Sequence, residues 1–158
     1  MPFLINGIEV DIATAPPRDY RGAWMLDGEV VKIDPAKAAM IAIERIRYEA
    51  AEKRKEIDRG KSEANELKGA LALNARDDTR PAERDKARTM LEAYAKARGE
   101  SGWAAAADAI ITARNKWASR VMEVEMYEEL AWSQLQAATT AGQVADIEKQ
   151  ITEAIKGV

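Results

Sequence analysis

Residues 33–47 read IDPAKAAMIAIERIR, and this stretch separates two patterns of secondary structure in the sequence. Asp34 belongs to the residue types that favour the N-cap of a helix. Pro35 fits the first helical position, where a backbone N–H is not needed. From there the apolar residues step by three and four, a spacing that places them on one helix face. The stretch therefore predicts a helix that begins at residue 35.

The same spacing continues for about five heptads, which is typical of a coiled-coil seam. Its positions are Ala36, Ala39, Ile43, Ile46, Ala50, Lys53, Ile57, Gly60, Ala64, Leu67 and Leu71. Charged residues flank the seam, so the pattern predicts one long, exposed helix over about residues 35–73 that needs partners along its length. Glycine costs roughly 1 kcal/mol in a helix interior. Gly60 should therefore mark a bend or a weak point.

Before this helix, the sequence predicts two β-hairpins. Asn6-Gly7 and Asp27-Gly28 are pairs that favour two-residue hairpin turns. The strands expected around them are Phe3–Ile5, Ile8–Ile12, Tyr20–Leu26 and Glu29–Ile33. Pro16-Pro17 predicts an extended connector between the hairpins. So small a unit buries little apolar surface by itself and must lean on a partner surface.

Trp24 is the residue expected to attach the hairpins to the helix. Its strand is too short to cover an indole, and the start of the helix is the nearest surface in the sequence. We expect Trp24 to pack on Ala38, Ile41 and Arg45, with Arg21 on the same side of the ring.

Three further helices are predicted, over about residues 80–98, 102–138 and 140–156. Asn74 and the cluster Asp77-Asp78-Thr79 form a turn before Pro81, which fits a first helical position behind a capping Asp or Thr. Thr140 and Gln143 have capping-box spacing. The second of these helices carries the strongest stripe, namely Trp103, Ala107, Ile110, Trp117, Val121, Val124, Ala131 and Leu135. Another stripe widens its predicted buried arc, namely Ile111, Ala118, Met122, Met126 and Trp132.

The expected fold is mainly α, with a double β-hairpin module over residues 1–34 and a helical region over residues 35–158. The helices are expected to form an elongated bundle or a coiled-coil-like stalk. Whether they fold back or stay extended, and the number of copies, remain open. The candidate packing and interface residues are Arg21, Trp24, Ile43, Ile46, Ile57, Leu67, Trp103, Ile110, Trp117 and Trp132.

Composition argues against several classes of function. The 158 residues include no Cys and no His, which removes disulfides, thiolate zinc sites, Cys or His nucleophiles and the usual proton shuttle at pH 7. Lys and Arg number 24 against 27 Asp and Glu, and the net charge of −3 offers no basic field for nucleic acid. Neither a membrane span nor a secretory signal is predicted, so we expect a soluble protein made in the cytoplasm.

The motifs that suggest chemistry have simpler explanations. The acidic run Glu123–Glu129 suggests a carboxylate metal site, but a solvated helix face is the better interpretation without histidine. Ser101 in RGESG lacks the strand and the base of a nucleophile elbow, so we expect it to cap a helix. Trp103 and Trp117 favour core or interface packing over a stacking platform. We therefore predict no enzyme activity, no cofactor and no metal.

Two segments resemble small proteins from the tail and tail-fibre regions of tailed bacteriophages and prophages. The first segment reads APPRDYRGAWMLDGEVVKIDPAKAAMIAIERIR and the second reads AATTAGQVADIEKQI. The shared residues of the first are Pro16, Pro17, Tyr20, Arg21, Ala23, Trp24, Leu26, Asp27, Gly28, Val30, Val31, Asp34, Ala38 and the Ile-Arg-rich stretch through Arg47. The resemblance covers about a third of the chain, and its motifs are structural.

The resemblance implies a structural virion component of the tail or its fibres, assembled in the host bacterial cytoplasm. Its expected partners are other copies of itself and other phage tail or fibre proteins. In this interpretation the hairpins are a docking or oligomer-nucleating head on a helical stalk. The alternatives are an assembly chaperone that never enters the virion and a cytoplasmic coiled-coil regulatory protein.

Overall fold

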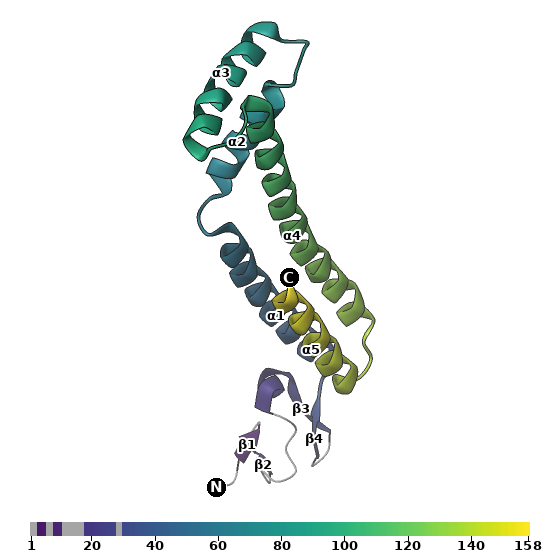
Figure 1. Cartoon of the computed structure of the whole chain (residues 1–158). Coiled ribbons are helices and arrows are strands. Elements are labelled where there is room, and N and C mark those ends of the chain that lie inside the picture. Colours follow the sequence, from purple (N-terminus) through teal and green to yellow (C-terminus); the bar gives the residue numbers. More distant parts are fainter. Residues whose placement is uncertain (1–2, 6–7, 11–17, 28–29) are drawn as a thin grey trace. The chain divides into compact units, whose positions relative to one another are not determined.

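A computed structural model describes residues 3–5, 8–10, 18–27 and 30–158 of the chain. Within these residues the fold is mainly helical, as predicted, with two small antiparallel hairpins before the helices. The helices are α1 (Pro35–Asp58), α2 (Ser62–Asn74), α3 (Pro81–Arg98), α4 (Trp103–Ala137) and α5 (Ala141–Gly157). Figure 1 shows their order along the chain.

Each hairpin is a pair of short strands. Strand β1 (Phe3–Ile5) pairs with β2 (Ile8–Val10), and β3 (Trp24–Asp27) pairs with β4 (Val30–Ile33). The predicted turn residues Asn6, Gly7 and Gly28 and the connector Pro16-Pro17 lie outside the described residues. The two-residue spacing in both registers agrees with the hairpins that the sequence predicted.

The second hairpin differs from the prediction in two details. Asp27 pairs with Val30 inside the ladder, so residues 28 and 29 lie between the strands, one position later than expected. The carboxylate of Asp27 forms an ion pair with Lys32, which holds this residue in the strand. Residues before Trp24 form a 3₁₀ helix, η2 (Arg18–Ala23), in place of the predicted strand from Tyr20.

The prediction of one helix over residues 35–73 is wrong, because the helix breaks after Asp58. Arg59 and Gly60 both have positive φ, at 47° and 68°, a conformation that ends an α-helix. The break also changes which side of the helix the predicted seam residues occupy. Before it, Ile43 and Ile46 are buried, whereas Leu67 after it is 73% exposed.

The described chain divides into two compact units, which we treat separately. Unit 1 comprises residues 1–53 and 123–158, and unit 2 comprises residues 54–122. The predicted division between residues 1–34 and 35–158 stays a prediction.

Unit 1 has its core between α1, the C-terminal part of α4 and α5. The largest fully buried side chains there include Ile46, Val124, Leu135, Val144 and Ile155. Helix α5 lies alongside α1 (Figure 1), and ion pairs join them at Arg45–Glu148, 3.2 Å, and Glu49–Lys156, 3.9 Å. The residue numbers of the paired side chains increase in the same order along α1 and α5. The two helices therefore run in the same direction.

The helices of unit 1 begin where the sequence predicted. Asp34 accepts hydrogen bonds from the backbone N–H groups of Ala36, at 2.9 Å, and Lys37, at 3.3 Å, and so caps α1. Thr140 and Gln143 form the predicted capping box at the start of α5. Both caps satisfy N–H groups that have no partner within their helix.

Unit 2 packs α2 and α3 on the N-terminal part of α4. Its core is built from small residues and a few larger ones, namely Ala72, Ala75, Ala87, Leu91, Ala95, Ala106, Ala107 and Ile110. Pro81 opens α3 as predicted, but its N-cap is Arg80 and makes no side-chain cap bond. Glu92, rather than the predicted Ser101, accepts a hydrogen bond of 2.8 Å from the N–H of Trp103, the first residue of α4.

Candidate interaction sites

An apolar groove runs between α1 and α4 in unit 1. The groove has a volume of about 580 Å³, and its apolar walls include Met40 and Ile43 from α1 and Trp132 and Leu135 from α4. Met40 is 68% exposed and Trp132 is 42% exposed, so two large apolar side chains face solvent beside a buried floor. We call this feature the α1–α4 groove.

Helix α5 does not cover the groove. It contacts α1 through Arg45, Glu49 and Lys53, which share one face at intervals of four residues. The groove lies along Met40 and Arg47, which belong to the opposite face of α1 by the 3.6-residue period. The α1–α4 groove is therefore on the side of α1 away from α5.

Charged residues line the edges of the α1–α4 groove. A smaller hollow of about 180 Å³ shares Ile43, Arg47 and Trp132 with it and adds Glu128 and Glu129. Arg47 forms an ion pair of 3.3 Å with Glu44 and places its guanidinium carbon 5.4 Å from the centre of the Trp132 ring. This contact places Arg47 of α1 over the indole ring of Trp132.

A polar cluster on another face of unit 1 joins η2, α1 and α5. The hydroxyl of Tyr20 donates a hydrogen bond to Glu148, which also pairs with Arg45. Arg45 donates to the carbonyl of Asp19 and lies 5.3 Å from the centre of the Tyr20 ring. Burial, reinforced by the bond to Glu148, raises the pKa of Tyr20 above its usual value. Because each group has a partner, the cluster serves to hold these segments together.

Unit 2 contains a small pocket with basic walls. It has a volume of about 170 Å³ and is lined by Lys68, Tyr94, Arg98 and Arg114 among others. The charged ends of Lys68 and Arg98 lie 5.7 and 5.5 Å from the centre of the Tyr94 ring. Arg98 is paired with Glu100 at 3.0 Å and Arg114 with Glu66 at 3.1 Å. The pairing neutralises most of the positive charge of this pocket.

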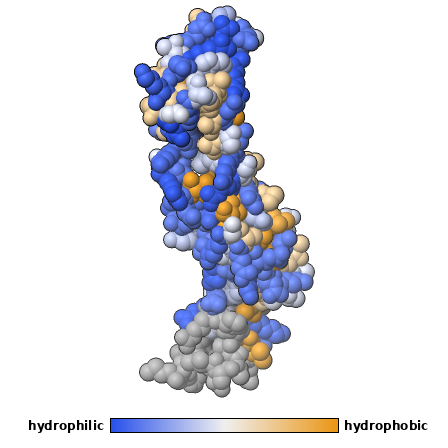
Figure 2. Space-filling model, viewed as in Figure 1, coloured by the Kyte–Doolittle hydropathy of each residue, from blue (hydrophilic) through white to orange (hydrophobic). Residues whose placement is uncertain are grey.

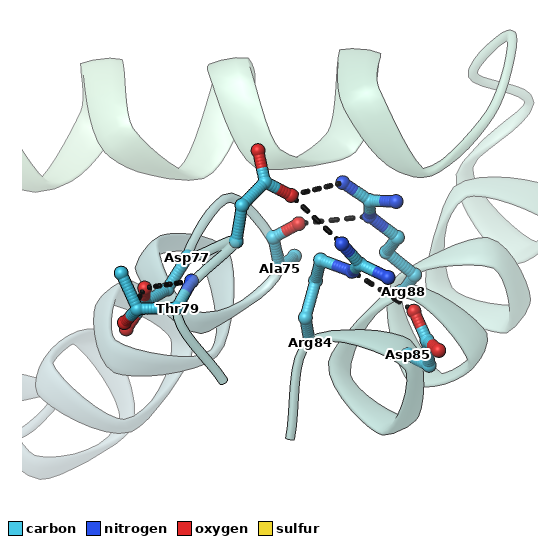
Figure 3. A network of polar contacts seen from close by, with 7 residues as sticks. Ala75, Asp77, Thr79, Arg84, Asp85 and Arg88 are labelled. Carbon is cyan, nitrogen blue, oxygen red and sulfur yellow. Dashed lines mark hydrogen bonds and ion pairs between the residues drawn. The ribbon is translucent and has the colours of Figure 1, made fainter. Parts of the chain in front are cut away.

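Unit 2 also contains a polar network, which closes the turn between α2 and α3 (Figure 3). Asp78 pairs with Arg84 at 2.8 Å, and Arg88 donates a 2.9 Å hydrogen bond to the carbonyl of Ala75. Arg88 also lies 4.4 Å from the centre of the Trp103 ring. Since Ala75 is the C-cap of α2, this arginine satisfies a free helix carbonyl. The role of this network is therefore structural: it holds the turn between α2 and α3 in place.

The structure places the candidate residues of the sequence in different environments. Ile43, Ile46 and Ile110 are buried, and Ile57, Trp103, Trp117 and Trp24 are partly buried. Leu67 and Trp132 are exposed, and so are Met122 and Met126, which were expected to widen the buried arc of α4. That expectation was wrong for Met122 and Met126, because the two side chains are 63% and 56% exposed.

Arg21 lies near Trp24 as expected, with its guanidinium carbon 5.8 Å from the ring centre. The aromatic that joins η2 to the helices, however, is Tyr20, which is only 5% exposed. The sequence placed Tyr20 at the start of an expected strand and gave it no packing role, because its partner Glu148 is 128 positions away. The α1–α4 groove was also missed, since it depends on which face of α1 is covered by α5.

Among the described residues, no group of three or more His, Cys, Asp or Glu side chains is arranged to hold a metal ion. None of the described helices is both long enough and apolar enough to cross a membrane. On the face drawn in Figure 2, apolar residues form separate patches in a hydrophilic surface. Comparison of the chain with protein-family models, curated proteins and solved structures finds no match.

Proposed function

We propose that this chain is a structural component of a tailed-phage particle, associated with the tail or its fibres. It acts without catalysis, by docking to other particle proteins and by association with further copies of itself. The docking-head role of residues 1–34 and the elongated, coiled-coil-like stalk belong to this proposal.

The observation that carries the docking function is the open apolar surface of unit 1. The α1–α4 groove displays Met40 and Trp132, and a different face of α4 displays Met126 and Leu130, which are 56% and 41% exposed. Exposed apolar patches of this kind mark interaction sites in soluble proteins. The placement in a phage tail is supported by the resemblance of residues 16–47 and about 137–151 to proteins of that region.

The placement is tested by mass spectrometry of purified particles from the phage or prophage that encodes the chain. We expect the chain in intact particles at a constant ratio to the other tail proteins. If it is abundant in the lysate but absent from purified particles, the structural role is overturned and an assembly chaperone is the better explanation.

Self-association is tested by sedimentation of the purified full chain at micromolar concentration. We expect a dimer or a larger species, because association would remove the exposed apolar side chains of Met126 and Leu130 from water. The variant Met126→Ser should shift the equilibrium toward monomer. A wild-type chain that sediments as a monomer would contradict self-association.

A further inference from the structure

We infer that the α1–α4 groove of unit 1 binds a basic amphipathic helix of a partner protein. This inference rests on the docking function proposed above and names the surface and the chemistry of its occupant.

The walls of the groove favour a helical occupant. They are formed by two helices, whose backbone groups are already paired within each helix and offer no ladder to an extended strand. A helix satisfies its own backbone and presents only side chains to Met40, Ile43 and Trp132. Methionine adapts its shape to different apolar partners, which suits a docking wall. With α1, α4 and α5 already in place, such a helix would be the fourth of a bundle.

The length of the walls sets the length of the occupant. On α1 the groove runs from Asp34 to Arg47, which corresponds to roughly 20 Å at the rise of an α-helix. On α4 it runs, with the smaller hollow, from Glu128 to the end of the helix. A partner helix of about 14 residues would fill this length.

The acidic side chains along the edges of the α1–α4 groove favour a basic occupant. Asp34, Glu44, Glu128 and Glu129 line the groove and its smaller hollow, where Arg47 is the basic residue among the lining side chains. Glu44 and Glu129 are exposed. Glu44 is paired with Arg47, and Asp34 caps α1, but acidic side chains still outnumber basic ones along the lining. Lysine or arginine on the flanks of the partner helix would be attracted by this excess of negative charge. A second copy docked groove to groove would bring the same acidic edges and be repelled.

The test uses two labelled helical peptides of about 14 residues with the same leucine face. One carries lysine on the flanks of that face and the other carries glutamate. Each is titrated with the full-length protein, and binding is followed by fluorescence anisotropy at low and high salt. We expect the basic peptide to bind at least about tenfold more tightly at low salt, and the preference to shrink as salt screens the charges.

Two variants of exposed residues report whether the peptide occupies the groove. Met40→Ser removes an apolar wall without a change of charge and should weaken the basic peptide severalfold. Glu44→Lys/Glu129→Lys should reverse the preference between the peptides. The matched controls are Met90→Ser, an exposed methionine of α3, and Glu63→Lys/Asp146→Lys, which changes the net charge equally at exposed positions outside the groove.

The outcomes separate this inference from the docking function. Equal binding of both peptides, preference for the acidic peptide, no binding, or binding that Met40→Ser leaves unchanged would each overturn the basic-helix inference. A dimer in sedimentation that Met40→Ser dissociates would also overturn it, because the occupant would then be a second copy. Detection of the chain in purified particles would support docking in any of these cases.

Discussion

Tyr20 is a single residue that joins three segments of unit 1. Its ring is buried, its hydroxyl donates to Glu148 of α5, and Arg45 of α1 lies against its face. Burial is the main cause of its raised pKa, and the hydrogen bond to Glu148 adds to it. In the folded protein Tyr20 therefore keeps its proton at a pH where an unfolded tyrosine, with a pKa of about 10, loses it.

This difference predicts a stability that depends on pH. Below about pH 10 both states hold the proton and the contribution of Tyr20 is complete. As the pH rises above about 10, the unfolded state releases its proton first, so the free energy of unfolding falls. Tyr20→Phe should lose about 1 to 3 kcal/mol at pH 8, and its deficit relative to wild type should shrink above pH 10.

Urea unfolding of both proteins at pH 8 and above pH 10 measures this deficit. Tyr48→Phe is the control, because Tyr48 is exposed and should show little change at either pH. A deficit that stays constant across this pH range would mean that the hydroxyl of Tyr20 does not keep its proton on folding.

The residue type at position 69 is restricted by Arg114, which is distant from it in the sequence. It lies inside α2, where alanine is normally preferred by roughly 1 kcal/mol. A Cβ at this position would lie 2.3 Å from Cδ of Arg114, whose guanidinium pairs with Glu66. Alanine would push this side chain away from α2, so the packing offsets the gain in helix propensity.

A double-mutant cycle tests this explanation. In the Arg114→Ala background, Gly69→Ala should raise the free energy of unfolding by about 0.5 to 1 kcal/mol. In the wild-type background the gain should be smaller or become a loss, a coupling that thermal or urea unfolding of the four proteins measures. Equal effects in both backgrounds would show that Arg114 does not restrict residue 69.

At the scale of elements, the break between α1 and α2 changes the expectation for Gly60. The sequence predicted that Gly60 lies inside one long helix, and alanine at such a position would raise the free energy of unfolding. In the structure Gly60 has a φ of 68°, and a Cβ added to it would meet no other atom within 4 Å. The restriction is therefore backbone conformation rather than crowding.

Gly60→Ala should lower the free energy of unfolding by about 1 kcal/mol, because an L-residue with a side chain is strained in this region. Gly60→Asn should lose less, since asparagine tolerates left-handed backbone. Gly157→Ala is the control, as its position has no positive φ and open space around it. A higher melting temperature for Gly60→Ala would indicate that α1 and α2 form one continuous helix in solution.

Local signals explain which elements were predictable. Asp34 and Thr140 mark helix starts through bonds to residues two or three positions away, so the sequence alone located both. At Gly60 the sequence predicted a bend or a weak point rather than the end of a helix, because the presence of a glycine does not determine its φ. The α1–α4 groove was not predictable, since it depends on the face of α1 that Glu148 and Lys156 of α5 cover.

At the scale of the whole molecule, the chain forms two compact units with separate sets of buried residues. In unit 2, Leu91 is the large, fully buried side chain among many alanines. In unit 1, Ile155 of α5 is fully buried. A core built largely from alanine buries less apolar area per residue, so the loss of Leu91 should affect unit 2 severely.

The last prediction is that the units lose protection separately. Leu91→Ala should cost about 2 to 5 kcal/mol and reduce hydrogen-exchange protection mainly in residues 54–122, while α5 stays protected. Ile155→Ala should have the opposite distribution, with the loss centred on α1 and α5. Met90→Ala is the matched control, because Met90 is the exposed neighbour of Leu91 and should change neither unit. A uniform loss across the chain in both core variants would mean that the two units unfold as one, since the opening of either core would then expose every amide together.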